Sequence, residues 1–230
     1  MSTSLDSLLV GVAEVKALRT HFVVRRGSIP TGLEADAARA HGRGCVVLLS
    51  SHYERYFYAV NEEAVEWLNS RTCPLSRFPL SFLLQHSQFS INDIAQTAWE
   101  KREERLRHFA RTESLLWAPE GVTGSLDHSQ ILTWMKSPKP KDITRFYRHY
   151  GIDEVFKAVT RAPGARSQLF FDLKELVEKR NAIAHGDASV EALPADVTRY
   201  LSSVAKFTRS ADLLLAKKVR QMSGVPIDPW

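Results

Sequence analysis

The sequence predicts an all-α fold: an antiparallel helical bundle with an inserted segment that is partly irregular and partly helical. Apolar residues recur with a period of about 3.6 in every long regular segment, and no segment shows the alternation of a half-buried strand. Prolines and glycines gather between residues 71 and 141. We therefore expect one domain over residues 1–230, with an N-terminal helical extension at about 1–31 and an insertion at about 71–141.

Composition and charge narrow the class of protein. Hydrophobic residues make up 44% and charged residues 25%, as in globular proteins with a substantial core. The net charge of +5 is compatible with a phosphate-bearing partner. No apolar run approaches the ~20 residues that span a bilayer, so we expect no membrane association. With two cysteines, Cys45 and Cys73, and no basic leader, the expected compartment is the cytoplasm.

The N-terminal half contains one short and one long helical pattern. Residues 5–19 predict a helix, residues 21–31 a linker, and residues 33–70 the longest helix. The expected buried face of the long helix is apolar and aromatic: Val46, Leu49, Tyr53, Tyr56, Phe57, Val60, Ala64 and Leu68. A second, half-polar face of this helix carries Glu54.

The insertion predicts two further helices. One covers residues 91–111 with Ser90 as its N-cap, and a short one covers residues 131–135. The charge run within residues 91–111 alternates in sign, which is typical of a solvated helix face. Trp117 and Trp134 indicate either a packed patch or contact with a partner.

Helical patterns continue to the C-terminus. Residues 142–150 and 152–159 predict short helices, the first closed by Gly151, and a longer helix ends at Gly186. The last helix starts at Pro194. Its expected buried face is Val197, Leu201, Val204, Phe207, Leu213, Leu214 and Val219.

The helix that ends at Gly186 carries an unusual polar group. Its apolar stripe of Leu169, Leu173, Leu176 and Ile183 is interrupted by Arg180, whose charge on a buried face needs an anionic partner. Asn181 and His185 lie four residues apart on an adjoining face, with His185 in the last turn. An intramolecular ion pair for Arg180 and an ordinary cap for His185 are the alternative interpretation.

The string Leu-Val-Glu-Lys-Arg-Asn-Ala-Ile-Ala-His-Gly, which ends at Gly186, resembles the Arg-x4-6-His motif of HEPN domains. Residues 149–156 resemble the turn and helix that precede the motif in this family, and residues 46–68 resemble its long first helix with an embedded glutamate. The resemblance covers roughly residues 39–220. It departs at Asp187, where some toxin members carry a tyrosine that an antitoxin modifies.

The resemblance implies a metal-independent endoribonuclease that cleaves RNA through its 2′-hydroxyl. The products are 2′,3′-cyclic phosphate and 5′-hydroxyl ends, and the setting is defence or toxin–antitoxin biology. His185 is expected to act as general acid or base. Arg180 is expected to stabilise the phosphorane charge, and Asn181 to orient His185 or hold a phosphate oxygen. Glu54 of the first long helix is expected to face the motif, although it is equally compatible with a solvent-facing glutamate.

The remaining expectations concern RNA, cofactors and partners. Lys179 and Lys174 are the expected RNA-binding residues of the motif helix. We expect no cofactor and no metal, because no His-Glu-x-x-His or paired Cys-x-x-Cys spacing is present. Arg180 and His185 are about 140° apart around a helix, so we expect a homodimer with a composite active site. A neutralising or regulatory protein partner is a further possibility.

Two other functions remain open. The chain could be a catalytically silent HEPN-like module that binds RNA, nucleotide or protein, as the insertion tryptophans and the C-terminal segment Val225–Trp230 suggest. A helix-turn-helix DNA-binding regulator is weaker, because no short helical pair ends in a basic recognition helix.

Overall fold

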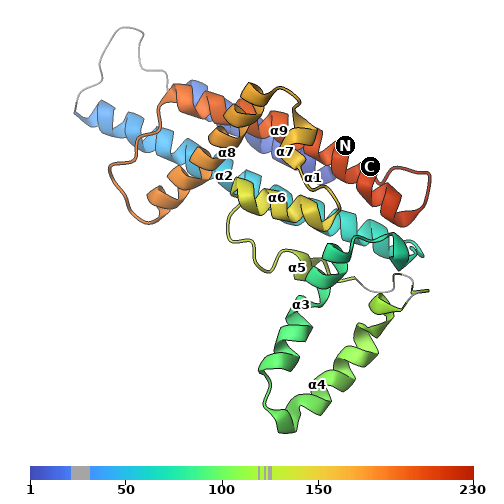
Figure 1. Cartoon of the computed structure of the whole chain (residues 1–230). Helices are drawn as coiled ribbons and strands as arrows, with labels where there is room; N and C mark the ends of the chain where they lie inside the picture. The colour runs from blue at the N-terminus through green and yellow to red at the C-terminus, as the bar shows by residue number, and fades with distance from the viewer. Residues whose placement is uncertain (22–31, 119, 122, 124–125) are drawn as a thin grey trace. The chain divides into compact units, whose positions relative to one another are not determined.

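The computed structural model describes residues 1–21, 32–118, 120–121, 123 and 126–230. This part of the chain contains helices and no strands, which confirms the all-α prediction (Figure 1). None of its helices is both long enough and apolar enough to cross a membrane. In chain order the helices are α1 (Thr3–His21), α2 (Leu33–Asn69), the 3₁₀ helix η1 (Leu75–Arg77), α3 (Leu80–Gln96), α4 (Trp99–Thr112), the 3₁₀ helix η2 (Ser114–Trp117), α5 (His128–Ile131), α6 (Pro140–His149), α7 (Val155–Val159), α8 (Pro163–Ala184) and α9 (Pro194–Ser223).

The chain folds into two compact units. The first comprises residues 1–60, 136–143 and 156–212, and the second comprises residues 61–135, 144–155 and 213–230. The expected insertion at 71–141 falls largely in the second unit, together with segments from α2, α6 and α9. The organisation as one domain stays a prediction. The sequence predicts a linker at residues 21–31, but His21 is the last residue of α1, and residues 22–31 lie outside the described residues.

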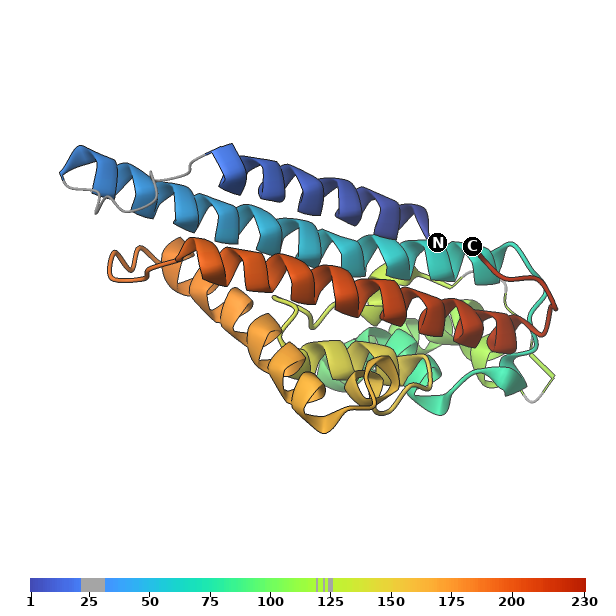
Figure 2. The same cartoon turned by 90° about the horizontal axis from the view of Figure 1, so that it is seen from above.

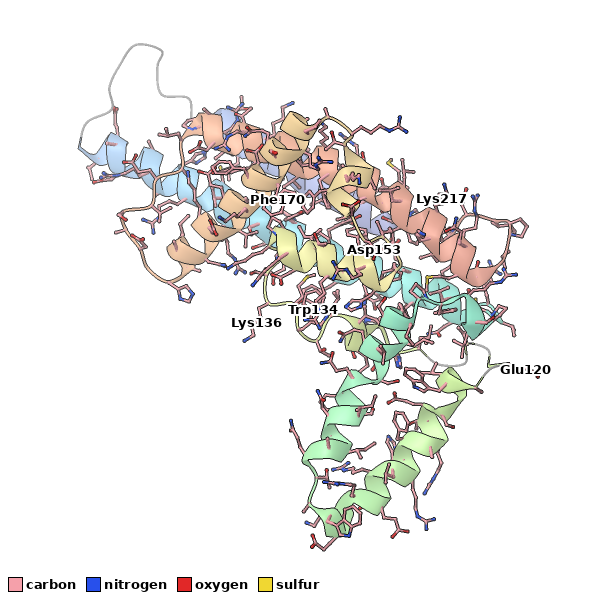
Figure 3. The ribbon with its side chains drawn as sticks, viewed as in Figure 1. Glu120, Trp134, Lys136, Asp153, Phe170 and Lys217 are labelled. Carbon is pink, nitrogen blue, oxygen red and sulfur yellow. The ribbon has the colours of Figure 1, made fainter. Side chains whose placement is uncertain are left out.

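The core of the first unit lies where α1, α8 and the first parts of α2 and α9 meet (Figure 2). Residues 46–60 of α2 contribute a nearly continuous buried stripe, as the period predicts. On α8, Phe170 packs edge-on against Phe156 with ring centroids 5.3 Å apart (Figure 3). The largest fully buried side chains of this unit are Tyr53, Tyr56, Tyr200, Phe57, Phe207, Leu5 and Leu49.

An ionic network joins α8 to the first part of α9, which returns antiparallel to it. Arg199 of α9 donates to Asp172 at 2.5 Å, Glu175 at 2.8 Å and Asp196 at 3.0 Å. Lys179 completes the network by pairing with Asp196 at 2.8 Å and Glu175 at 3.5 Å. We call these five residues the α8–α9 ionic network. It fixes the register of the helix that carries Arg180 and His185.

The second unit packs around a group of aromatic rings. Tyr150 lies 5.4 Å from both Phe82 and Phe146 by ring centroids, and its hydroxyl donates to Asn61 Oδ1 at 2.8 Å. Asn61 is itself buried and donates to the His128 carbonyl at 2.7 Å, so its amide is satisfied on both sides.

Trp134 forms a separate stack in the second unit (Figure 3). The guanidinium of Arg145 lies 4.2 Å from the Trp134 ring centroid, and the ring of His149 lies 6.0 Å away. Burial lowers the pKa of His149 to about 4, an effect that the hydrogen bond to Ser81 opposes. Trp134 therefore belongs to a packed patch of its own unit.

The predicted helix over residues 91–111 is wrong in its boundaries. The structure has two helices here, α3 and α4, because Thr97 and Ala98 adopt extended backbone angles between them. Ser90 lies inside α3, where its hydroxyl donates to Glu113, and is not an N-cap. Helix α3 begins directly after Pro79. Proline interrupts a preceding helix, but it is also favourable at the start of a new one.

Two smaller predictions are also wrong. The short helix predicted at residues 131–135 is α5, which ends at Ile131 and starts after Asp127, whose side chain accepts from the Ser129 amide. Leu213, predicted to be buried, is 62% exposed, because Ala211 and Leu215 occupy the buried positions of that turn. The other expected core positions of α9 are buried or half-buried.

Candidate functional site

The centre of the candidate site is an ion pair between α8 and α2 in the first unit. Arg180 Nη2 donates to Glu54 Oε2 at 3.1 Å. Both side chains keep about a quarter of their surface exposed, 27% for Arg180 and 22% for Glu54. The arginine that interrupts the apolar stripe of α8 thus meets a carboxylate at the edge of the core, within reach of solvent. A purely structural ion pair has the same geometry, so the pair alone does not distinguish the two interpretations of Arg180.

Asn181 lies beside this pair and extends it. Its Oδ1 accepts from Arg180 Nη1 at 3.0 Å, so the two guanidinium nitrogens Nη1 and Nη2 bond to different oxygens. The side chain of Asn181 is therefore directed to Arg180, while the backbone carbonyl of Asn181 accepts from the His185 amide at 3.0 Å. A guanidinium carries five N–H donors, so this arrangement leaves donors for a further anion.

His185 is the C-cap residue of α8 and is exposed. The next residue, Gly186, has φ +84°, a left-handed conformation that favours glycine and ends the helix. The Gly186 amide donates to Ile183 and the Asp187 amide to Ala182, which closes the helix end. Neither ring nitrogen of His185 has a hydrogen-bond partner among the described residues. The helix end fixes the backbone position of His185 and leaves both ring nitrogens available.

The two expected RNA-binding lysines differ in their surroundings. Lys179 belongs to the α8–α9 ionic network, where its charge is matched by Asp196 and Glu175 and only 20% of its side chain is exposed. Lys174 is half exposed and lies 3.8 Å from Glu178, one turn along α8. Of the two, Lys174 is the one placed to reach a ligand. It lies on the exposed side of α8 that ends at His185.

The structure adds residues that sequence reasoning missed. Tyr58 lies one turn after Glu54 on α2; burial and the nearby Glu54 carboxylate raise the pKa of its hydroxyl. Arg43 lies three turns before Glu54, and its Nη1 donates to the Ala188 carbonyl, just beyond His185, at 3.4 Å. Helical spacing puts residues 43, 54 and 58 on one face of α2, but it does not predict the contact of Arg43 with the loop after His185.

No cluster of three or more His, Cys, Asp or Glu side chains suited to hold a metal ion occurs in residues 1–21, 32–118, 120–121, 123 and 126–230. The groups that the site does contain are a guanidinium, an amide, a carboxylate and an imidazole. This set can bind a phosphate, stabilise negative charge and transfer a proton.

Comparison with known proteins gives one match. The sequence model of the RiboL-PSP-HEPN family matches residues 29–217, which is well over half of the chain and includes α2, α8 and most of α9. No curated protein and no solved structure matches the chain.

Proposed function

The chain belongs to the RiboL-PSP-HEPN family, and from that premise we propose that it is a metal-independent endoribonuclease. The observation that carries the proposal is the arrangement at the end of α8. A partly exposed Arg180 is held by Glu54 and Asn181, and five residues later His185 is exposed with both ring nitrogens available. These groups can bind the scissile phosphate, stabilise the negative charge that develops on it and transfer one of the two protons.

In the proposed reaction, the 2′-oxygen of RNA forms a bond to the adjacent phosphorus and the bond from phosphorus to the 5′-oxygen breaks. One proton leaves the 2′-hydroxyl and one is delivered to the 5′-oxygen, so the products are a 2′,3′-cyclic phosphate and a 5′-hydroxyl. His185 carries out one of these proton transfers. Arg180 donates to the phosphorane oxygens, where the planar fork matches the developing charge. Glu54 and Asn181 hold the guanidinium in place.

We also propose that the active form is a homodimer. A single imidazole cannot accept the first proton and deliver the second in one concerted step, whereas two copies supply two. The exposed side of α8 that leads to His185 carries Phe171, Lys174 and Glu178 and is a suitable contact surface. Adding an excess of His185→Ala protein to the wild type should lower the activity per wild-type chain, because a mixed dimer holds a single imidazole. Wild-type activity that is unaffected by an excess of His185→Ala would argue against a composite site.

The test of the function is cleavage of mixed cellular RNA in EDTA by wild type, Arg180→Ala and His185→Ala. We expect cleavage by the wild type with cyclic-phosphate ends, and a loss of at least 100-fold in both variants. His108→Ala and Arg55→Ala are matched controls, since both residues are exposed and lie outside the Arg180 contacts; both should cleave normally. Cleavage that survives in both site variants would reject the assignment.

The second candidate function is a non-cleaving interaction module. Two large aromatic side chains of the second unit, Phe89 on α3 and Trp99 on α4, are 64% and 77% exposed, more than packing within the chain accounts for. A wild type that binds RNA or protein but leaves RNA intact in the same assay would favour this alternative.

A further inference from the structure

Arg43 lies at the far end of the face of α2 that carries Glu54. The two residues are eleven apart, which is three helical turns and about 16 Å along the axis. Glu54 contacts Arg180 of α8, and Arg43 contacts Ala188 beyond the end of α8. His185 lies in the stretch of chain between these two contacts. The segment that carries the expected proton-transfer residue is therefore tied to α2 by one guanidinium contact before it and another after it.

Arg43 has few partners for its charge. No carboxylate lies within ion-pair distance of it in the part of the chain that the structure describes. Its hydrogen bond to the Ala188 carbonyl is long, and the remaining N–H donors of its guanidinium can bind a ligand. Hydrogen bonds from Ser189 and, to a smaller extent, the charge of Arg43 lower the pKa of the exposed Asp187 carboxyl.

The position of Arg43 relative to the end of α8 is fixed by packing. A Cβ atom on the neighbouring Gly42 would overlap the carbonyl oxygen of Ala192, so only glycine lets the 187–193 loop approach α2 this closely. Ala192 is buried in that contact. The loop that follows His185 is thus held against α2 at Gly42, directly beside Arg43.

We propose that Arg43 is a substrate-binding residue that holds a phosphate of the same RNA strand, away from the phosphate that is cleaved. This inference rests on the proposed ribonuclease function. Arg43 and Glu54, the partner of Arg180, are about 16 Å apart along α2, a spacing that suits two phosphates of one RNA strand that are more than one nucleotide apart. Because Arg43 binds a phosphate that does not react, its contact is equally strong in the ground state and the transition state. It should therefore lower KM and leave kcat unchanged.

The test uses Arg43→Gln and Arg43→Lys, with Arg55→Gln as the control. Arg55 is an exposed arginine of the same helix, about 120° around the axis from Arg43. We expect Arg43→Gln to raise KM for RNA about tenfold with kcat within twofold. In a His185→Ala background, the same change should weaken RNA binding about tenfold and reduce the slope of log K against log salt by about 0.7. Arg43→Lys should keep the salt slope, and Arg55→Gln should match the wild type.

The outcomes separate this proposal from the function on which it rests. If the wild type cleaves RNA and Arg43→Gln leaves KM unchanged, the assignment of Arg43 is overturned while the function stands. A fall in kcat alone would also overturn it, because it would mean that Arg43 only positions the loop and His185. If the wild type cleaves nothing, the proposed function fails. RNA binding then tests the role of Arg43. A smaller slope of log K against log salt in Arg43→Gln supports the phosphate contact, and an unchanged slope rejects it.

Discussion

Two arginines of the first unit, Arg180 and Arg199, meet carboxylates in very different ways. Arg199 bonds to three carboxylates within 3.0 Å, and one of them, Asp172, is 2% exposed and also accepts from Ser203 at 2.6 Å. Burial acts to lower the pKa of Arg199, but its hydrogen bonds to the three carboxylates raise that pKa above its usual value. Arg180 bonds to one carboxylate and one neutral amide.

The two arginines differ in how many carboxylates of the same chain accept hydrogen bonds from the guanidinium N–H donors. In the α8–α9 ionic network, two cations face three carboxylates, and every charged group has at least one partner of opposite sign. Beside Glu54, Arg180 keeps donors to spare, although its side chain is about as exposed (27%) as that of Arg199 (30%). The first arrangement favours a stable helix pair, and the second leaves capacity for an anion. The following variants test this contrast.

The sharpest test exchanges each arginine for lysine, which keeps the charge and removes the planar fork. Arg180→Lys should lower the rate of RNA cleavage about 100-fold, because an ammonium cannot bond to a phosphate, Glu54 and Asn181 in the same geometry. Its free energy of unfolding should change by less than about 1 kcal/mol, as expected for a half-exposed pair.

Arg199→Lys should behave in the opposite way. It should lose about 2 kcal/mol of stability, because one ammonium cannot reach all three carboxylates, and it should cleave RNA normally below its unfolding transition. Denaturant unfolding and initial cleavage rates, measured on both proteins, give the comparison. Equal losses of activity in the two variants would remove the distinction between the clusters.

The next largest effect concerns the buried carboxylate of the network. Asp172→Ala should lower the free energy of unfolding by about 3 kcal/mol, because Arg199, Ser203 and Gln168 each lose a hydrogen-bond acceptor in a dry environment. Urea unfolding followed by far-ultraviolet circular dichroism measures it. Lys174→Gln, which removes an exposed pair from the same helix, should cost no more than about 0.5 kcal/mol. Similar costs for both would show that burial of Asp172 contributes little.

Glu54→Gln probes the partner of Arg180. Glutamine keeps an oxygen for the guanidinium but removes the charge that holds it, so we expect kcat to fall about tenfold. RNA binding in a His185→Ala background should tighten, since a negative charge near the phosphate is removed. Unchanged kcat would assign Glu54 to stability alone, and weaker binding would contradict the expected electrostatics.

Much of the fold follows from periodicity. The stripe from Val46 to Leu68 is buried as predicted, because a helix with one apolar face removes that face from water by packing it against the core. The same reasoning failed where a helix could begin at more than one residue. Pro79 could end one segment or begin another, and only packing of Phe82 onto Tyr150 decides that α3 begins there. For Leu213, three consecutive leucines left the register of the buried face undetermined.

The contacts of the candidate site were predictable to the extent that they follow from single helices. Arg180 interrupts an apolar stripe, so a carboxylate partner was required, and the half-polar face of α2 offered Glu54. Arg43 could not be found this way, because its place depends on where the loop after Gly186 crosses α2. The partners of Lys179 depend in the same way on the approach of α9. Tertiary contacts between distant segments leave no periodic signal.

The smallest expected effect is a pH dependence that belongs to the network and not to the Arg180 site. Burial acts to raise the pKa of Asp196, but hydrogen bonds from Lys179 and Arg199 outweigh it and lower that pKa below its usual value. The unfolded chain therefore binds the proton more tightly than the folded protein. The stabilisation is complete above pH of about 4 and is lost as the pH falls through the folded pKa.

Asp196→Asn isolates this contribution. At pH 6 the variant should be less stable than the wild type by about 0.5–1 kcal/mol, the range of a partly exposed ion pair. As the pH falls below about 4 the difference should shrink, because the wild-type carboxylate is protonated and loses the same interactions. Urea unfolding of both proteins at pH 6, 4 and 3 measures the difference. Parallel curves at all three pH values would mean that Asp196 stabilises the α8–α9 pair through packing and not through its charge.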